Sequence, residues 1–250
     1  MYILIIIIIK RYIYKNIMLK YYHSYSEKGV LFNEIKMPNG YHLFIFTSHT
    51  QASYEHFPDI TSESTRVRLS QFTEIRKFIT KMTENAKSTD IILLCGDLNV
   101  NGRLNKDDGK THSEEYKAVI SILKGSLSVI KKEKEEGYKD EISETLEYEV
   151  EDLFYNELNE HPVTSCDLFP DNYYKDGKGK KSRKCLDYFF KFTKINFEPS
   201  SNIEPNSDEN INPTSHLSLE DLTINSFDVS DKKFVHLSDH YGLSLNIVSK

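Results

Sequence analysis

The segment Ile91-Ile92-Leu93-Leu94-Cys95-Gly96-Asp97-Leu98-Asn99-Val100 shows most clearly how this chain is organised. An unbroken apolar run of strand length ends in a glycine and is followed by two polar residues two positions apart. Side chains two positions apart lie on the same side of an extended backbone, so we expect Asp97 and Asn99 to face one site. Asp and Asn are also ordinary turn residues, so the pattern alone also describes a strand followed by a turn.

A second predicted strand ends in a comparable way. The runs 30–35 and 41–47 are rich in β-forming residues, and the Asn-Gly pair in Met37-Pro38-Asn39-Gly40 between them is typical of a hairpin. The second run leads directly into Ser48-His49-Thr50-Gln51, so His49 follows its strand as Asp97 follows the other. A histidine in this position is more often a hydrogen-bonded structural residue than a catalytic one.

Two helices are predicted from apolar residues that recur at helical spacing. The segment 64–86 repeats such residues from Phe72 to Met82 and places charged residues on its other faces. A polar turn over 101–109 then leads into a second helical pattern over 114–124. The order hairpin, helix, strand predicts a layered α/β domain.

The second half of the chain is less regular. Residues 131–152 are dense in Lys and Glu with few large apolar residues, which predicts a solvated helical insertion. Strand character returns over 186–192, and 199–216 is a Pro/Asn/Ser-rich insertion that predicts a loop. The chain closes with an alternating strand that is entered through Ser238-Asp239-His240-Tyr241-Gly242.

Composition narrows the class of protein. With 250 residues and 38% hydrophobic content, we favour one domain over 28–250. The net charge of −6 and the pI of about 5.9 disfavour nucleic acid as the main partner, because affinity for phosphate backbones needs a basic face. Three separated cysteines form neither a disulfide framework nor a zinc signature. Cys95 is predicted to be a buried apolar residue of the core. Cys166 and Cys185 would form a disulfide only in an oxidising compartment.

The segment 1–27 is an atypical apolar and basic stretch. Its apolar run Ile3–Ile9 precedes Lys10 and Arg11, which is the wrong order for a secretory signal. The run is also far shorter than the roughly 20 residues that span a bilayer, so no transmembrane helix is expected. Three interpretations of the segment stay open: a strand, a remnant of a longer signal, or an artefact of where the chain was taken to start. We assign it no targeting role.

Four motifs in order resemble the endonuclease/exonuclease/phosphatase superfamily. They are Ser48-His49-Thr50-Gln51-Ala52, Gly96-Asp97-Leu98-Asn99-Val100, Leu186-Asp187-Tyr188 and Ser238-Asp239-His240-Tyr241-Gly242. The first motif, together with Lys28-Gly29-Val30 and the stretch 68–75, is similar to neutral sphingomyelinases of the bacterial secreted type. The resemblance covers roughly 28–248. It implies a four-layered α/β sandwich of two mostly antiparallel sheets flanked by helices, with the active site at the strand ends.

The resemblance also implies an activity, that of a Mg²⁺-dependent phosphodiesterase that cuts sphingomyelin into ceramide and phosphocholine. Such a site needs a base to activate water, a cation to neutralise phosphoryl oxygens, and hydrogen bonds that strengthen as charge develops. The implied partner is sphingomyelin in membranes, and the implied state is a secreted or membrane-surface monomer. No segment of the sequence stands out as a membrane-docking element.

The resemblance assigns roles residue by residue. His240 becomes the general base on the attacking water, and Asp187 a residue behind it that could fix a histidine tautomer. The other expected site residues are Asp239 near the metal and phosphate, His49 on the phosphoryl oxygens, Asn99 orienting phosphate, and Asp97 orienting the nucleophile or contacting the base. Thr164 and Asp167 match a further polar turn of the family.

The chain departs from the family pattern at the metal site. The family carries an Asn and its principal metal ligand, a Glu, on strands that should precede Lys28. The segment before that residue offers only Asn16 and Glu27, neither in a suitable motif, so the principal Glu ligand is not found in this chain. Asp239 is the metal ligand that remains, and weak Mg²⁺ binding is expected.

Other functions stay open beside the sphingomyelinase. A nuclease of the superfamily is disfavoured by the acidic charge balance. An inositol polyphosphate phosphatase is disfavoured because the Trp-Cys-Asp-Arg stretch of those enzymes is missing from a chain without tryptophan. An inactive, truncated relative that binds a membrane or a partner is the third alternative, and a soluble α/β domain with coincidental motifs is the fourth.

Overall fold

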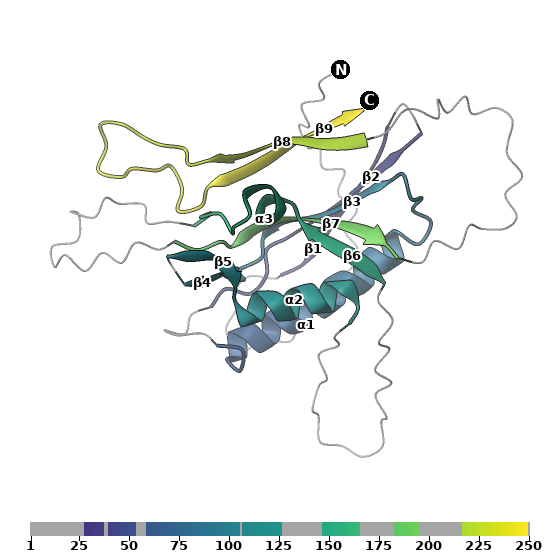
Figure 1. Cartoon of the computed structure of the whole chain (residues 1–250), viewed down its shortest axis with the longest axis horizontal. Coiled ribbons are helices and arrows are strands. Elements are labelled where there is room, and N and C mark those ends of the chain that lie inside the picture. Colours follow the sequence, from purple (N-terminus) through teal and green to yellow (C-terminus); the bar gives the residue numbers. More distant parts are fainter. Residues whose placement is uncertain are drawn as a thin grey trace, which may run out of the picture.

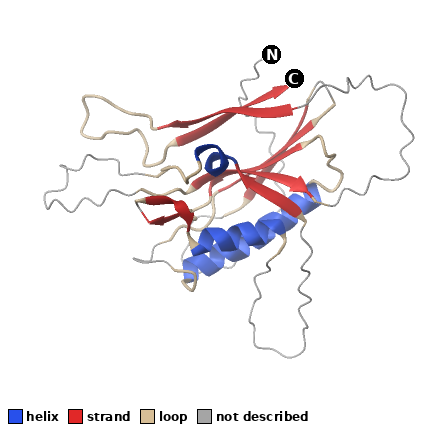
Figure 2. Cartoon of the chain, in the orientation of Figure 1, coloured by secondary structure: helices blue, strands red, loops and turns tan. Residues whose placement is uncertain are grey.

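The computed structural model describes residues 28–37, 40–53, 59–105, 107–126, 147–165, 183–195 and 217–249, and it shows an α/β fold (Figures 1 and 2). Its elements are β1 (Val30–Lys36), β2 (His42–Ser48), α1 (Glu63–Met82), β3 (Ile91–Asp97), β4 (Arg103–Asn105), β5 (Asp108–His112), α2 (Glu114–Lys124), β6 (Tyr148–Asp152), α3 (Leu153–Leu158), β7 (Asp187–Lys194), β8 (Leu217–Asn225) and β9 (Gly242–Ser249).

A five-stranded mixed sheet in the order β1-β2-β3-β7-β6 forms the centre of the fold. β1 and β2 pair antiparallel as the predicted hairpin, whose turn is closed by the Gly40 N–H donating to the Met37 carbonyl at 3.0 Å. β2 and β3 are parallel because α1 crosses over between them, while β7 runs antiparallel to both β3 and β6. Four predicted strands, β1, β2, β3 and β7, therefore lie in one sheet with β3 at its middle, while the predicted C-terminal strand is β9 of the separate β8–β9 pair.

The two predicted helices are confirmed, and local capping explains where they begin and end. The side chains of Ser62 and Ser113 accept hydrogen bonds from the backbone N–H three residues later, which satisfies donors in the first turns of α1 and α2. α2 ends at Gly125, which adopts the left-handed conformation with φ 93° that glycine takes without steric cost. No described helix combines the length and the hydropathy that a membrane crossing requires.

The two faces of the sheet bury different clusters. On one face, Phe46 and Leu94 pack with Phe72 and Ile79 of α1, and α2 lies beside α1 beneath the sheet in Figure 1. On the other face, Leu43 joins a cluster with Ile91, Leu93 and Ile247, over which the two-stranded ribbon of β8 and β9 lies. Each such buried side chain contributes roughly 1.5 to 3 kcal/mol of transfer free energy. In the described residues this second face carries only the ribbon and α3, so the four-layered sandwich stays a prediction.

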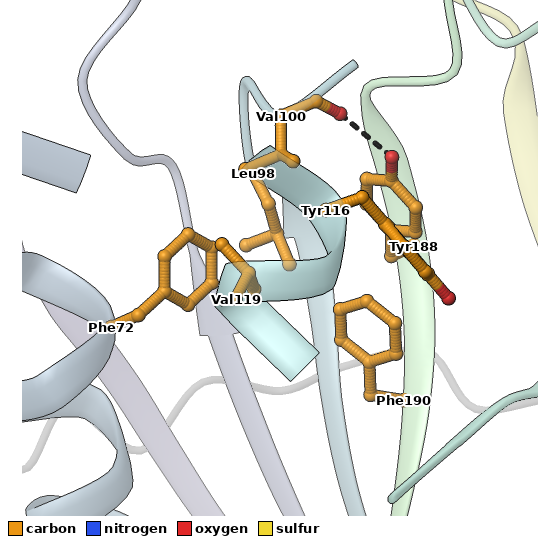
Figure 3. Close-up of a pocket in the computed structure, with 7 residues that line it drawn as sticks. All are labelled: Phe72, Leu98, Val100, Tyr116, Val119, Tyr188 and Phe190. Atoms are coloured by element: carbon orange, nitrogen blue, oxygen red, sulfur yellow. Dashed lines mark hydrogen bonds between the residues drawn. The ribbon is translucent and has the colours of Figure 1, made fainter. Parts of the chain in front are cut away.

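The core continues under the turn that follows β3. Seven residues close over this region and leave no room for a ligand: Phe72, Leu98, Val100, Tyr116, Val119, Tyr188 and Phe190 (Figure 3). The Tyr188 hydroxyl donates a 2.6 Å hydrogen bond to the Val100 carbonyl, so even the polar atom at the rim is satisfied. The turn that carries Asp97 and Asn99 therefore rests on a closely packed base.

Two predictions about local structure are wrong. The predicted polar turn over 101–109 contains β4 and the first two residues of β5, and these two strands pair as a short antiparallel hairpin. The end of the predicted helical insertion 131–152 is β6, which pairs with β7, because Tyr148 is buried in the core as the strand alternates. Residues 131–146 of that insertion, the predicted loop 199–216 and the segment 1–27 lie outside the described residues.

The cysteines agree in part with expectation. Cys95 is half-buried rather than fully buried, and burial raises the pKa of its thiol to about 11. Cys185 is buried, and burial raises the pKa of its thiol above the ordinary value. Both thiols are therefore held in the protonated, unreactive form, and Cys166 lies outside the described residues.

At Gly96 the backbone of β3 passes close to the Ser48 end of β2. Its φ is 129°, and a Cβ added there would lie 2.2 Å from the Ser48 carbonyl oxygen. Gly96→Ala should therefore lower the free energy of unfolding by about 2 to 4 kcal/mol, measured by urea denaturation. Gly29→Ala is the matched control, because a Cβ there meets nothing within 4 Å. Equal stability of the two variants would contradict the close approach.

Candidate active site

The register of β3 against β7 sets two carboxylates opposite each other. Asp97 pairs directly with Asp187 across the antiparallel ladder, so their side chains project from the same face at one end of the sheet. Burial, and then the negative charge of Asp187, raise the pKa of Asp97 above its ordinary value. The pair therefore attracts a cationic or hydrogen-bonding group.

His240 supplies that group. Its Nδ1 lies 2.9 Å from Asp187 Oδ2, and its Nε2 lies 3.9 Å from Asp97 Oδ2. The hydrogen bond to Asp187 is the largest factor that raises the pKa of His240. The negative charges of Asp187, Asp97 and Asp239 raise this pKa further, whereas partial burial of the ring lowers it. The imidazolium form is thus stabilised at this end of the sheet.

The contacts of His240 define the chemistry of each ring nitrogen. A carboxylate can only accept, so Nδ1 carries the proton that is donated to Asp187, and the lone pair of the neutral ring lies on Nε2. The separation of 3.9 Å from Asp97 is too long for a direct hydrogen bond. Nε2 is therefore directed into the site as a proton acceptor.

Thr164 fixes the segment that carries His240. Its side-chain oxygen accepts hydrogen bonds from the backbone N–H groups of Leu186 and Asp187 at 2.9 and 3.1 Å, and its carbonyl accepts one from Tyr241 at 2.7 Å. Thr164 is fully buried, so these bonds are shielded from water. The start of β7 and the His240 segment are thereby held in one geometry, while Asp167 lies outside the described residues.

His49 and Asn99 approach Asp97 from the neighbouring turns. His49 Nε2 lies 3.4 Å from Asp97 Oδ2, and the histidine side chain is 60% exposed. Asn99 adopts a left-handed conformation with φ 51°, donates its backbone N–H to Asp97 Oδ1 at 3.0 Å, and donates its side-chain amide to the Thr50 carbonyl at 3.1 Å. The two strand ends inferred from the sequence therefore meet.

Asp239 stands outside this cluster although it precedes His240. Its side chain is exposed, and within the described part of the chain no hydrogen bond or ion pair joins it to the other site residues. The structure thus brings together His49, Asp97, Asn99, Asp187 and His240, while their roles in a reaction stay predictions. Sequence reasoning missed the structural importance of Thr50 and the closeness of Lys28, whose pKa burial lowers while the charge of Asp97 opposes the shift.

The donor set fits a divalent cation in part. Asp97, Asp187 and His240 each offer a ligand atom, and these atoms lie within 4.8 Å of one another. Carboxylate oxygens suit Mg²⁺, so Asp97 and Asp187 are the residues that would hold it. Both carboxylates already contact His240, however, and an imidazole nitrogen is not a preferred Mg²⁺ ligand. The described residues therefore predict a weak site.

Comparison with known proteins confirms the resemblance. No protein-family model matches the chain. A sphingomyelinase from Dictyostelium discoideum is 30% identical over 268 residues, which cover 88% of this chain and 54% of that protein. The chain therefore spans about half the length of this relative.

Solved structures with partial similarity include a bacterial toxin and a protein bound to DNA. A beta toxin variant from Staphylococcus aureus with bound magnesium ions is 18% identical at a TM-score of 0.41, covering 90% of this chain and 58% of that chain. TDP2 from D. rerio, complexed with a single-strand DNA product, is 15% identical at a TM-score of 0.46, covering 90% and 63%.

The pairing of Asp187 with His240 can be tested without a substrate. Asp187→Asn removes the negative charge and replaces the carboxylate acceptor of Nδ1–H with a weaker, neutral amide oxygen. The pKa of His240 should therefore fall, as measured by NMR titration of the imidazole in metal-free protein. Asp228→Asn is the control, because Asp228 makes the comparable 2.9 Å contact with His236 instead. An unchanged His240 titration in Asp187→Asn would show that the two side chains do not pair in solution.

Proposed function

The chain is a homologue of a sphingomyelinase over most of its length, and on this premise we propose that it hydrolyses sphingomyelin to ceramide and phosphocholine. The observation that supports this most strongly is the Asp187–His240 pair, which directs a basic nitrogen toward Asp97 and His49 at one end of the sheet. A phosphodiester anion repels nucleophiles, so its hydrolysis needs such a base and groups that offset phosphoryl charge.

His240 is the general base in this proposal. A water at Nε2 gives a proton to the ring as its oxygen forms a bond to phosphorus. The bond from phosphorus to the ceramide oxygen breaks on the opposite side, where that oxygen takes a proton from solvent. Asp187 stabilises the imidazolium that forms, in the way a buried aspartate supports a catalytic histidine. Asp97 Oδ2, 3.9 Å from Nε2, is placed to accept the second hydrogen bond of that water. The pair thus activates and orients one nucleophile.

His49 and Asn99 act on the phosphate in this proposal. The exposed His49 ring can donate to a phosphoryl oxygen while it remains beside Asp97. The turn that carries Asn99 is fixed to Asp97 and Thr50, so the amide approaches the substrate from a rigid base. Both groups stabilise charge that grows on the phosphoryl oxygens in the transition state.

We propose Mg²⁺ as the metal, held by Asp97 and Asp187, whereas Asp239, the ligand expected from the family resemblance, lies outside their cluster. When bound, the cation neutralises the non-bridging phosphoryl oxygens. Too few carboxylates are present among the described residues for a strong site, because Mg²⁺ keeps several waters and relies on the charge of its ligands. Activity should therefore need a high Mg²⁺ concentration.

Exposed apolar side chains beside the site favour a lipid substrate over nucleic acid. Phe227, Phe234 and Leu237 are 48%, 36% and 69% exposed, and they lie on the segment between β8 and β9 that leads into His240. A bridge between Asp228 and His236 closes this segment into a hairpin. Together with a net charge of −6, this surface suits insertion at a membrane surface and does not suit a phosphate backbone.

The central test is phosphocholine release from sphingomyelin vesicles. Release should require Mg²⁺ and stop when the cation is chelated. His240→Ala should lower its rate by about 10² to 10⁴, the usual contribution of a positioned general base. His42→Ala is the control, because His42 pairs with Glu34 at the other end of β2. Release that is absent at every Mg²⁺ concentration, or equal in wild type and His240→Ala, would refute the proposal.

The exposed segment before His240 makes a separate prediction. Leu237→Glu should reduce co-sedimentation with sphingomyelin vesicles and the rate on them, because a charge replaces the most exposed large apolar side chain described. Hydrolysis of a dispersed short-chain substrate should change little. Ile195→Glu is the matched control, since Ile195 is 43% exposed just beyond the end of β7 that lies farthest from Asp187. Equal vesicle binding by both variants would exclude this docking surface.

A further inference from the structure

The loop that carries His49 is fixed by contacts of its neighbours. The Thr50 N–H donates to the Asp97 carbonyl at 3.2 Å, and its carbonyl accepts from the Asn99 side chain. The Gln51 N–H donates to Gln71 Oε1 at 2.9 Å, and its carbonyl accepts from Arg68 Nη1 at 2.9 Å. Because the His49 ring is itself exposed, the fixed backbone that follows it decides where the ring lies.

Arg68 connects this loop to two helices. Its guanidinium is fully buried and forms a two-pronged ion pair with Glu115 of α2, at 2.6 Å from Nε and 3.0 Å from Nη2. Nη2 also donates to Thr65 Oγ1 of α1 at 3.2 Å. One planar group therefore contacts both helices and the Gln51 carbonyl at once.

This arrangement favours a role in geometry over a role in stability. The desolvation of a fully buried guanidinium and a partly buried carboxylate offsets most of their attraction, so such a pair adds little net stability. The rigid fork of a guanidinium does set the direction of every hydrogen bond that it makes, which the flexible point charge of a lysine cannot do. The value of Arg68 therefore lies in where it places the Gln51 carbonyl.

We propose that Arg68 is a positioning residue for His49, which it holds beside Asp97 through the backbone of Gln51. Gln71 fixes the same residue from the other side of its backbone. Its side-chain oxygen accepts from the Gln51 N–H, while Arg68 donates to the Gln51 carbonyl. The consequence for catalysis rests on the proposed function, in which His49 stabilises phosphoryl oxygens. A shift of about 1 Å in such a group can cost about 10²-fold in rate.

The test compares Arg68→Lys with Arg76→Lys. Arg76 is on the same helix, largely buried, and paired with Glu147 at 3.2 Å, but its partner lies away from the His49 loop. In protein labelled at histidine, the His49 imidazole cross-peak, identified by its loss in His49→Gln, should move or broaden in Arg68→Lys and stay in place in Arg76→Lys. In phosphocholine release, kcat should fall by about 10-fold to 100-fold with little change in KM, because the loss is specific to the transition state.

A second variant covers the case in which Arg68→Lys does not fold. Gln71→Met removes one neutral contact to the Gln51 N–H and should move the same cross-peak in a folded protein. An unchanged His49 cross-peak in the folded variant overturns the positioning role. If the wild type releases no phosphocholine, the proposed function fails while the cross-peak still decides the role of Arg68.

Discussion

The candidate site depends on the repulsion between two carboxylates that the β3–β7 ladder places opposite each other. Two unit charges about 4 Å apart near a protein surface interact with about 4 kcal/mol, which is large beside the net stability of a domain. Asp97 and Asp187 cannot move apart, because the register of the strands is fixed by hydrogen bonds along their length. The protonated His240 ring relieves the repulsion, because it directs one N–H toward each carboxylate.

The surroundings of this pair keep it in place. The turn after β3 rests on a packed core, and Thr164 binds the backbone of β7 and of the His240 segment simultaneously. Gly96 allows β2 to approach closely enough for the His49 turn to reach Asp97. Rigid strands and a close-packed base therefore support polar groups that would otherwise be mobile at a surface.

Sequence reasoning succeeded where one strong local pattern was enough. The apolar run before Asp97 and the helical spacing from Phe72 onward predicted β3 and α1, and ordered motifs added His240 to the same site. β6 was hidden because its exposed face is as acidic as the segment before it. The positioning role of Arg68 could not be predicted for another reason. Its partner Glu115 is 47 residues away, and no local sequence pattern indicates such a contact.

The contacts that join distant segments at the site have a consequence for the order of folding. The site joins segments that are far apart in sequence, since His240 and its partner Asp187 are separated by 53 residues and Thr50 and its partner Asn99 by 49. Contacts between residues so far apart in sequence form slowly, because the conformational entropy of the long intervening loop is lost before the contact is gained. A folding intermediate that contains only the β1–β3 unit would hold Asp97 without its histidine. The complete cluster is therefore a property of the finished topology and should form only in the final, cooperative step of folding.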